Sequence, residues 1–179
     1  MLNDIEKVLI TEEELNKRVK ELAEILDNDY EGKNPVMVCI LKGSIHFFST
    51  LTKEMKIRQV YDFMAVSSYG ANTFSSGNVK LIKDLSINIE GRHVVLVEDI
   101  VDSGHTLNYL IEMLKVRKPA SIEVCTLLDK KCRRVVPLKS KYVGFDIDDY
   151  FVLGYGLDYD EYYRNLPFIG ILKEEVYKK

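Results

Sequence analysis

The sequence lacks several features that would assign it at once to a class. Its three cysteines, Cys39, Cys125 and Cys132, form no CxxC pair and show no metal-ligand spacing with the three histidines. No apolar run is long enough to span a membrane, and the first residues, which include acidic side chains, contain no signal-peptide core. We therefore expect a cytoplasmic protein without membrane segments, in which Cys39 and Cys125, both within apolar runs, are reduced core residues.

The chain also lacks a basic excess. Its 25 Lys and Arg against 28 Asp and Glu give a net charge of −3, which argues against a nucleic-acid-binding protein. The phosphate-binding patterns G-x-x-x-x-G-K-[ST] and G-x-G-x-x-G are both missing. The 179 residues, 46% hydrophobic and 30% charged, suit one well-cored globular domain.

The most informative stretch runs from Val94 to Thr106, VVLVEDIVDSGHT. Four apolar residues predict a buried strand, Glu98 and Asp99 follow its carboxyl end, and Asp102 opens a turn before a helix-like apolar stripe. A strand, a tight loop and a helix N-terminus offer backbone N–H groups to a phosphate. The loop adds hydroxyl groups and a residue that permits close approach, namely Ser103, Thr106 and Gly104.

The carboxylates beside this loop have a different use, because they repel phosphate. They suit sugar hydroxyls, a divalent cation or a proton. Two other interpretations remain: the acids could simply cap the helix and face water, or the acidic pair could be that of a response-regulator receiver. The second is disfavoured because about ninety residues precede the pair.

Strand and helix patterns alternate through the rest of the chain. A capping box, Thr11 to Glu14, begins a helix that we expect to end near Asp27. A second helix is expected after Ser44, following the apolar run Val36–Leu41. The predicted strands are Val36–Leu41, Val60–Val66, Val79–Ile82, Val94–Val97, Ser121–Leu128, Tyr142–Asp146, Tyr150–Leu153 and Phe168–Leu172. Such alternation predicts a parallel sheet, whose ligands bind at the carboxyl ends of its strands.

The stretch Val94–Thr106 resembles the phosphoribosyl pyrophosphate (PRPP) binding signature of type I phosphoribosyltransferases. The resemblance implies an α/β fold with a central, mostly parallel sheet flanked by helices, a small hood and a flexible lid loop. It implies that Asp102 is the general base, that Glu98 and Asp99 bind the ribose, and that Mg²⁺ is the cofactor. The implied 5′-phosphate ligands are Asp102, Ser103, Gly104, His105 and Thr106.

Three further motifs strengthen the resemblance to the hypoxanthine-guanine members of this family. LKGSIHFFSTL resembles their pyrophosphate loop, in which the peptide before the lysine is cis, and implies that Lys42 and Gly43 bind pyrophosphate. Nine of the twelve residues from Ser67 to Asn78 are Ser, Gly, Asn or Thr, which indicates either a solvated hairpin tip or a mobile lid. Its SSYG resembles the catalytic loop of these enzymes and adds Ser68 and Tyr69 to the pyrophosphate site.

The last motifs concern the base. Lys130 follows a strand end and, by resemblance, donates to the exocyclic oxygen of a 6-oxopurine, although Lys131 and Cys132 depart from the bacterial pattern LDKPxRR; a basic run of this kind can also be a solvated face. The aromatic stretch from Tyr150 to Arg164 indicates a packed cluster or resembles the purine-facing hood. The resemblance implies that Phe151, Val152 and Asp158 bind the base and that Arg164 binds pyrophosphate. It also implies that Asp158 holds the metal together with Glu98 and Asp99.

The resemblance thus implies one domain over residues 1–179, with a core at about 30–145 and a hood from about 1–10 and 146–179. The implied reaction transfers the 5-phosphoribosyl group from PRPP to hypoxanthine or guanine, in a homodimer or homotetramer. The competing interpretation is a PRPP-sensing regulator on the same fold. It is disfavoured because no helix-turn-helix extension is evident and base-recognition residues are present.

Overall fold

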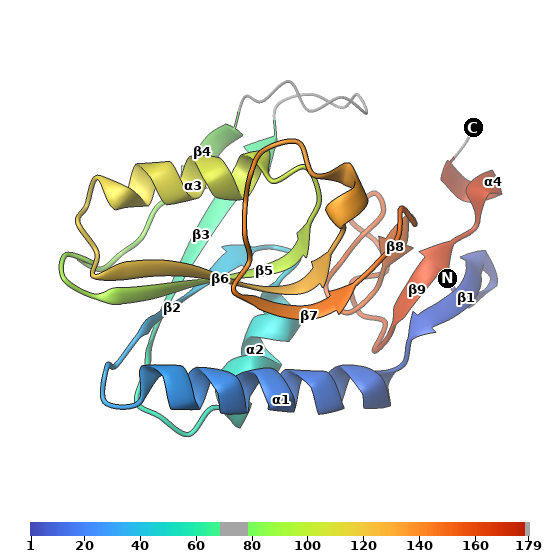
Figure 1. The fold of residues 1–179 in the computed structure, drawn as a ribbon. Coiled ribbons are helices and arrows are strands. Elements are labelled where there is room, and N and C mark those ends of the chain that lie inside the picture. Colours follow the sequence, from blue (N-terminus) through green and yellow to red (C-terminus); the bar gives the residue numbers. More distant parts are fainter. Residues whose placement is uncertain (69–78, 178–179) are drawn as a thin grey trace.

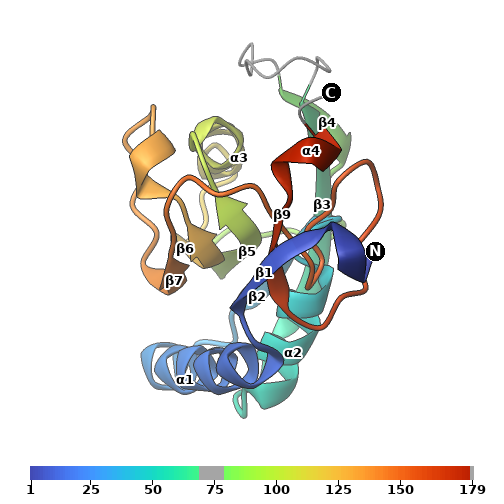
Figure 2. The same cartoon turned by 90° about the vertical axis from the view of Figure 1, so that its right-hand side faces the viewer.

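Two sheets organise the protein, whose computed structural model describes residues 1–68 and 79–177. A six-stranded sheet has the order β4-β3-β2-β5-β6-β7, and a three-stranded sheet with the order β1-β9-β8 lies at one end of it (Figures 1 and 2). The large sheet contains β2 (Val36–Leu41), β3 (Val60–Ser68), β4 (Val79–Lys83), β5 (His93–Val101), β6 (Ser121–Asp129) and β7 (Tyr142–Asp146). The small sheet contains β1 (Ile5–Ile10), β8 (Val152–Leu153) and β9 (Ile169–Leu172).

Helices cover both faces of the large sheet. The α-helices are α1 (Glu12–Tyr30), α2 (Ile45–Glu54), α3 (His105–Lys115) and α4 (Glu174–Tyr177), and short 3₁₀ turns occupy Leu2–Asp4 (η1) and Lys131–Arg133 (η2). Helices α1 and α2 lie against one face and α3 against the other (Figure 1). Neighbouring strands of the large sheet are parallel except β3 and β4. The predicted α/β class with a mostly parallel sheet is confirmed.

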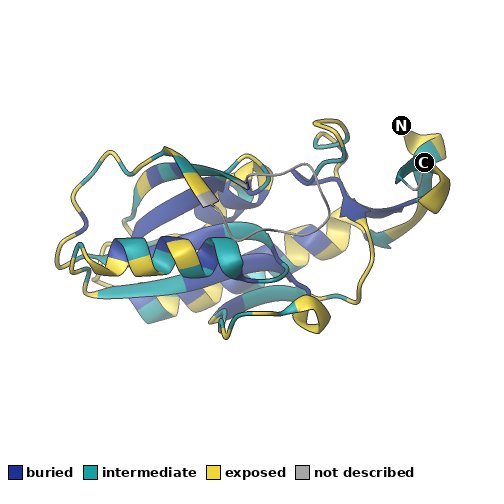
Figure 3. Ribbon diagram, turned by 90° about the horizontal axis from the view of Figure 1, so that it is seen from above, coloured by how far each residue is buried: buried dark blue, intermediate teal, exposed yellow. Residues whose placement is uncertain are grey.

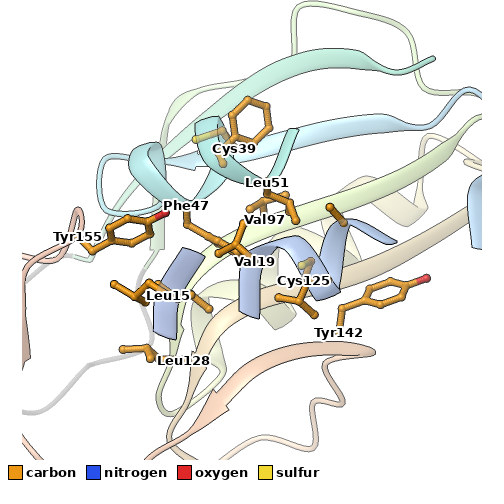
Figure 4. Packing of buried hydrophobic residues seen from close by; sticks show 14 of the residues in the cluster. Leu15, Val19, Cys39, Phe47, Leu51, Val97, Cys125, Leu128, Tyr142 and Tyr155 are labelled. Carbon is orange, nitrogen blue, oxygen red and sulfur yellow. The ribbon is translucent and has the colours of Figure 1, made fainter. Parts of the chain in front are cut away.

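The core has two layers because successive side chains of a strand point to opposite faces. In β2, Met37 and Cys39 belong to the cluster beneath α1 and α2, whereas Val38 belongs to the cluster beneath α3. Figure 4 shows the first cluster, with Phe47 of α2 among its buried members. Seen from above, the central strands are dark blue and the helices carry exposed outer faces (Figure 3). Cys39 and Cys125 are buried free thiols, as predicted.

Helix α1 begins as predicted and ends later. The Thr11 hydroxyl accepts from the Glu14 N–H at 3.3 Å, and the Glu14 carboxylate accepts from the Thr11 N–H at 2.8 Å. The helix continues past Asp27 to Tyr30, which is buried. Tertiary contacts stabilise this last turn, since Tyr142 of β7 donates its hydroxyl to Asp29 at 2.7 Å.

Several predicted strand boundaries also differ from those of the structure. Strand β5 does not end at Val97: it continues to Val101, because its pairing with β6 extends to Val101 opposite Asp129, and the acidic pair therefore lies within the strand. Strand β8 covers only Val152–Leu153 of the predicted Tyr150–Leu153, since only these two residues pair with β9.

Both ends of the chain form the small sheet. Strand β1 was not predicted; it pairs antiparallel with β9, with Ile10 opposite Ile169. Figure 2 shows the two termini on the same side of the molecule. Among the residues that the structure describes, no helix is both long and apolar enough to cross a membrane.

Candidate active site

The loop between β5 and α3 forms a cavity of about 130 Å³ at the carboxyl edge of the large sheet. Gly104 caps α3 with φ +86°, and a Cβ at this position would lie 2.9 Å from the Val136 side chain. The Ser103 carbonyl accepts from the N–H groups of Val135 and Val136 at 3.0 and 3.2 Å. These hydrogen bonds attach the loop to the segment between β6 and β7. The predicted phosphate loop is therefore a rigid turn at a helix N-terminus. The residues that line the cavity are Glu98, Ile100, Val101, Asp102, Ser103, Gly104, Thr106 and Leu107.

The acidic pair lies beside this loop, in a setting that favours a proton. Burial, with the neighbouring charge of Asp99 next in size, raises the pKa of Glu98 well above its usual value. Burial also raises the pKa of Asp99, although a hydrogen bond with Glu98 and the Ile100 N–H at 2.7 Å oppose this effect. Glu98 Oε2 is buried and, within the described chain, has no hydrogen-bond partner. The pair thus offers one buried oxygen atom, Glu98 Oε2, that can accept a hydrogen bond or bind a cation.

The Lys42-Gly43 turn contacts both the acidic pair and the C-terminal segment. The peptide bond between Leu41 and Lys42 is cis, as the resemblance implied. A Cβ on Gly43 would lie 1.6 Å from Asp99 Oδ2, and a Cβ on Gly156, where φ is +105°, would lie 1.9 Å from the Gly43 carbonyl oxygen. Glycine is required at both positions, because only a bare α-carbon allows the three segments to meet.

The two side chains predicted to bind pyrophosphate, Lys42 of this turn and Arg164, approach the same carboxylate. Lys42 Nζ lies 2.9 Å from Glu161 Oε2, and Arg164 Nη2 lies 3.2 Å from the same oxygen. Arg164 also lies 3.0 Å from Asp158 Oδ1 and donates through Nη1 to the Gly156 carbonyl at 2.8 Å. Lys42, Asp158 and Arg164 therefore belong to one charged cluster.

The predicted purine-side lysine is buried next to the same edge. Lys130 is 6% exposed and donates to the Tyr150 carbonyl at 2.8 Å. Asp149 lies 3.6 Å from Lys130 Nζ and 3.4 Å from Arg133 Nη1, and Arg133 Nε lies 3.6 Å from Asp102 Oδ1. A chain of charges thus joins Lys130 to Asp102.

The predicted base-stacking residue Phe151 lies in a cluster of aromatic rings. Phe151 is 38% exposed, and its ring stacks on Tyr177 of α4 with centroids 4.8 Å apart and meets Tyr159 edge-on at 5.6 Å. Val152 is buried in β8. Phe151 keeps an accessible aromatic surface at the end of the small sheet.

The structure describes some of the remaining predicted site residues and not others. His105 is the first residue of α3, directly after the loop that forms the cavity. Ser68 is the last residue of β3. Tyr69, with the remainder of the predicted lid to Asn78, lies outside the described residues. No three acidic, histidine or cysteine side chains gather as a metal cluster within residues 1–68 and 79–177, so Glu98, Asp99 and Asp158 are not preassembled.

Sequence reasoning missed three charged neighbours of the site. Arg133 lies within the basic run after Asp129, for which the sequence indicates either a solvated face or a ligand role of Lys130, and it approaches Asp102. Glu161 lies within the aromatic stretch from Tyr150 to Arg164, and Asp149 directly precedes this stretch. Their position next to predicted ligands in the sequence was the only available signal, since their partners come from distant segments.

Comparison with known proteins identifies the family. The family described as "Phosphoribosyl transferase domain" matches residues 9–160, most of the chain. The chain belongs to the phosphoribosyltransferase family. Its fold is that of the type I members of this family.

The similarity to individual phosphoribosyltransferases extends over the whole length. The chain is 51% identical over 176 residues to a hypoxanthine-guanine phosphoribosyltransferase of Streptococcus thermophilus, covering 98% of both chains. It is 52% identical over 178 residues to one of Bacillus subtilis, covering 99% of both. A crystal structure of a hypoxanthine phosphoribosyltransferase from Staphylococcus aureus matches with a TM-score of 0.96 and 51% identity, covering 100% of this chain and 97% of that one.

Proposed function

We propose that the protein is a purine salvage glycosyltransferase, which transfers the 5-phosphoribosyl group from PRPP to hypoxanthine or guanine and yields IMP or GMP and pyrophosphate. One observation carries this proposal: identity of 51–52% to hypoxanthine-guanine phosphoribosyltransferases extends over nearly the full length of both chains. The charged side chains gathered at one sheet edge support it. Nothing favours the alternative of a PRPP-sensing regulator.

The loop from Asp102 to Thr106 would bind the 5′-phosphate. Support comes from its cavity and from the N-terminus of α3, which directs backbone N–H groups and a positive dipole end at an anion. Ser103 and Thr106 add hydroxyl donors. Glu98 and Asp99, which repel phosphate, would accept hydrogen bonds from the ribose hydroxyls.

Transfer breaks a C–O bond at C1′ while a purine nitrogen attacks, so positive charge develops on the ribose and negative charge on the leaving pyrophosphate. Asp102 would accept the proton from purine N7; its Oδ1 is buried without a hydrogen-bond partner among the described residues. Lys130 would donate to O6. Its ammonium has three N–H groups, of which one is used on Tyr150.

The leaving pyrophosphate would be bound by Lys42, the Gly43 N–H and Arg164, with Ser68 and Tyr69 contributing from the lid. Mg²⁺ would be held by Glu98 and Asp99, with Asp158 nearby, and when bound it neutralises charge on the sugar and pyrophosphate oxygens. The unpartnered, buried Glu98 Oε2 fits this role. Two carboxylates are a normal set for Mg²⁺, which keeps several positions for water and substrate oxygens.

The small sheet with its loops would act as the hood, so that the domain consists of a core at about 30–145 and a hood from about 1–10 and 146–179. Phe151 would stack on the base, Val152 would bind the base edge through its backbone, and Asp158 would lie nearby. We further propose a homodimer or homotetramer and a cytoplasmic location. Two buried free thiols agree with a reducing compartment.

The test is an assay of nucleotide formation from PRPP with hypoxanthine, guanine, xanthine and adenine. Hypoxanthine and guanine should be substrates. Adenine should not, because the N–H groups of Lys130 would face an amino group, which is also a donor, a mismatch that can cost about 10⁴-fold. Xanthine should be poor, because it presents an acceptor at C2 where backbone carbonyls near Val152 and Asp158 favour a donor.

Each failure in this assay has a separate meaning. PRPP binding without product from any base would support the regulator. Efficient use of adenine would overturn the role of Lys130. Efficient use of xanthine would overturn only the argument about C2.

A further inference from the structure

One carboxylate oxygen bridges the two cations of the pyrophosphate site. Glu161 Oε2 lies 2.9 Å from Lys42 Nζ and 3.2 Å from Arg164 Nη2. Lys42 precedes α2, and the pair joins positions 119 residues apart in the sequence. A pyrophosphate oxygen bound by the same two cations would need the same place.

The two cations differ in how firmly they are held. Arg164, 22% exposed in its side chain, is fixed by the Gly156 carbonyl and by Asp158. Lys42, whose side chain is 68% exposed, pairs only with Glu161 among the described residues. The Glu161 side chain is itself 64% exposed. Ion pairs this exposed are weak and are readily exchanged for solute ions.

The backbone directs Glu161 toward the cations. The Glu161 N–H donates to Asp158 Oδ2 at 2.9 Å, and Tyr159 pairs with Tyr162 across the same tight turn. Asp160 and Glu161 adopt φ values of +52° and +67°, which are uncommon for residues other than glycine. The turn therefore holds the carboxylate at this place. Hydrogen bonds from Lys42 and Arg164 also lower the pKa of Glu161, so it carries a negative charge near neutral pH.

We propose that Glu161 is an internal competitor for the pyrophosphate site: its carboxylate neutralises Lys42 and Arg164 in the free protein and must leave when pyrophosphate or the pyrophosphate group of PRPP binds. This inference rests on the proposed function. A carboxylate that returns to the two cations lowers the affinity for pyrophosphate and so raises the rate at which this product is released. Glu161 thereby limits inhibition by the product.

The test compares Glu161→Gln with the wild type and with Asp160→Asn. Asp160 is exposed, neighbours Glu161 and forms no ion pair within the described part of the chain, so its variant removes an equal charge without freeing either cation. Titration calorimetry with pyrophosphate, with and without Mg²⁺, measures the affinity directly. Loss of two exposed ion pairs that compete with the ligand should tighten binding in Glu161→Gln by roughly 2- to 30-fold, whereas Asp160→Asn should remain near the wild type.

A second readout uses turnover. Inhibition of nucleotide synthesis by added pyrophosphate should be stronger in Glu161→Gln by a similar factor. Equal tightening in both variants would overturn the proposal in favour of a general charge effect, and weaker binding in Glu161→Gln would overturn it by showing that Glu161 positions the two cations for the ligand. If the wild type binds neither pyrophosphate nor PRPP and forms no nucleotide, the proposed function itself fails.

Discussion

Gly43 has almost no free space around its α-carbon, because Asp99 lies on one side of it and Gly156 contacts its carbonyl oxygen. We predict that Gly43→Ala abolishes nucleotide formation, since the new methyl group would overlap Asp99 Oδ2 and displace this carboxylate from the ribose site proposed above. The measurement is kcat/KM for PRPP. Gly32→Ala is the matched control, because Gly32 also has a restrictive position, with φ +71°, but no atom lies within 4 Å of its Cβ position. Activity that survives in Gly43→Ala would contradict the close packing of these segments.

Asp102 gives a second prediction at the same scale. Asp102→Asn should retain PRPP binding, because the loop and the N-terminus of α3 are unchanged, while turnover should fall by roughly 10²- to 10⁴-fold for loss of a general base. Binding by calorimetry and kcat by a spectrophotometric assay separate the two effects. A variant with normal kcat would remove Asp102 from the proton transfer.

At the scale of elements, a buried carboxylate joins β3 to the connection before β5. Asp62 is 4% exposed and accepts from the N–H groups of Phe63, Ser86 and Ile87 at 2.8, 2.7 and 3.1 Å. Burial alone would raise its pKa, but these backbone hydrogen bonds and the charge of Lys83 outweigh burial and lower the pKa of Asp62. The ionised form therefore stabilises the fold.

The pH dependence follows from this direction. A depressed folded pKa means that the unfolded chain binds the proton first, so the stabilisation is complete above the unfolded value of about 3.9 and is lost as the pH falls through the lower folded value. Asp62→Asn should cost about 1–3 kcal/mol near neutral pH. The difference in unfolding free energy between the two proteins should shrink below about pH 4.

Denaturant unfolding between pH 2 and pH 7 measures this difference, and the exposed Asp148→Asn is the control that should remain near the wild type. A difference that stays constant down to pH 2 would show that ionised Asp62 is not the stabilising form.

The elements also show how far sequence reasoning reaches. The large sheet could be predicted because β2 and β5 are apolar runs that end in turn residues, and these patterns are local. Strand β1 could not, since its residues are largely exposed and its partner β9 lies at the other end of the chain. The same limit applies to the site: the loop from Asp102 to Thr106 is contiguous, whereas the pairing of Lys42 with Glu161 depends on a turn that no periodicity reveals.

At the scale of the whole molecule, the two sheets differ in the size of their cores. The large sheet packs helices on both faces. The small sheet packs one face on the main core through Ile10, Val152, Ile169 and Ile171, whereas the cluster on its other face has, among the described residues, three buried members, Leu153, Leu166 and Leu172, with partly buried neighbours. Regions with few buried apolar contacts open at lower free energy. We predict that amide hydrogens of β1, β8 and β9 exchange faster than those of β2, β5 and β6.

Native-state hydrogen exchange at low denaturant concentration checks this prediction, and addition of IMP should slow exchange in the small sheet most, because the proposed base-binding residues Phe151 and Val152 lie there. Equal exchange free energies in both sheets, with and without IMP, would instead describe a single cooperative unit.

The pairing of β1 with β9 also sets the order in which a growing chain can acquire its structure. Residues 5–10 are synthesised well before residues 169–172, with which alone among the described strands they pair. The last strand of the large sheet, β7, ends at Asp146, so that sheet can assemble while the C-terminal segment is still being translated. During synthesis the loop from Asp102 to Thr106, which we propose binds the 5′-phosphate, can therefore form before the small sheet is complete.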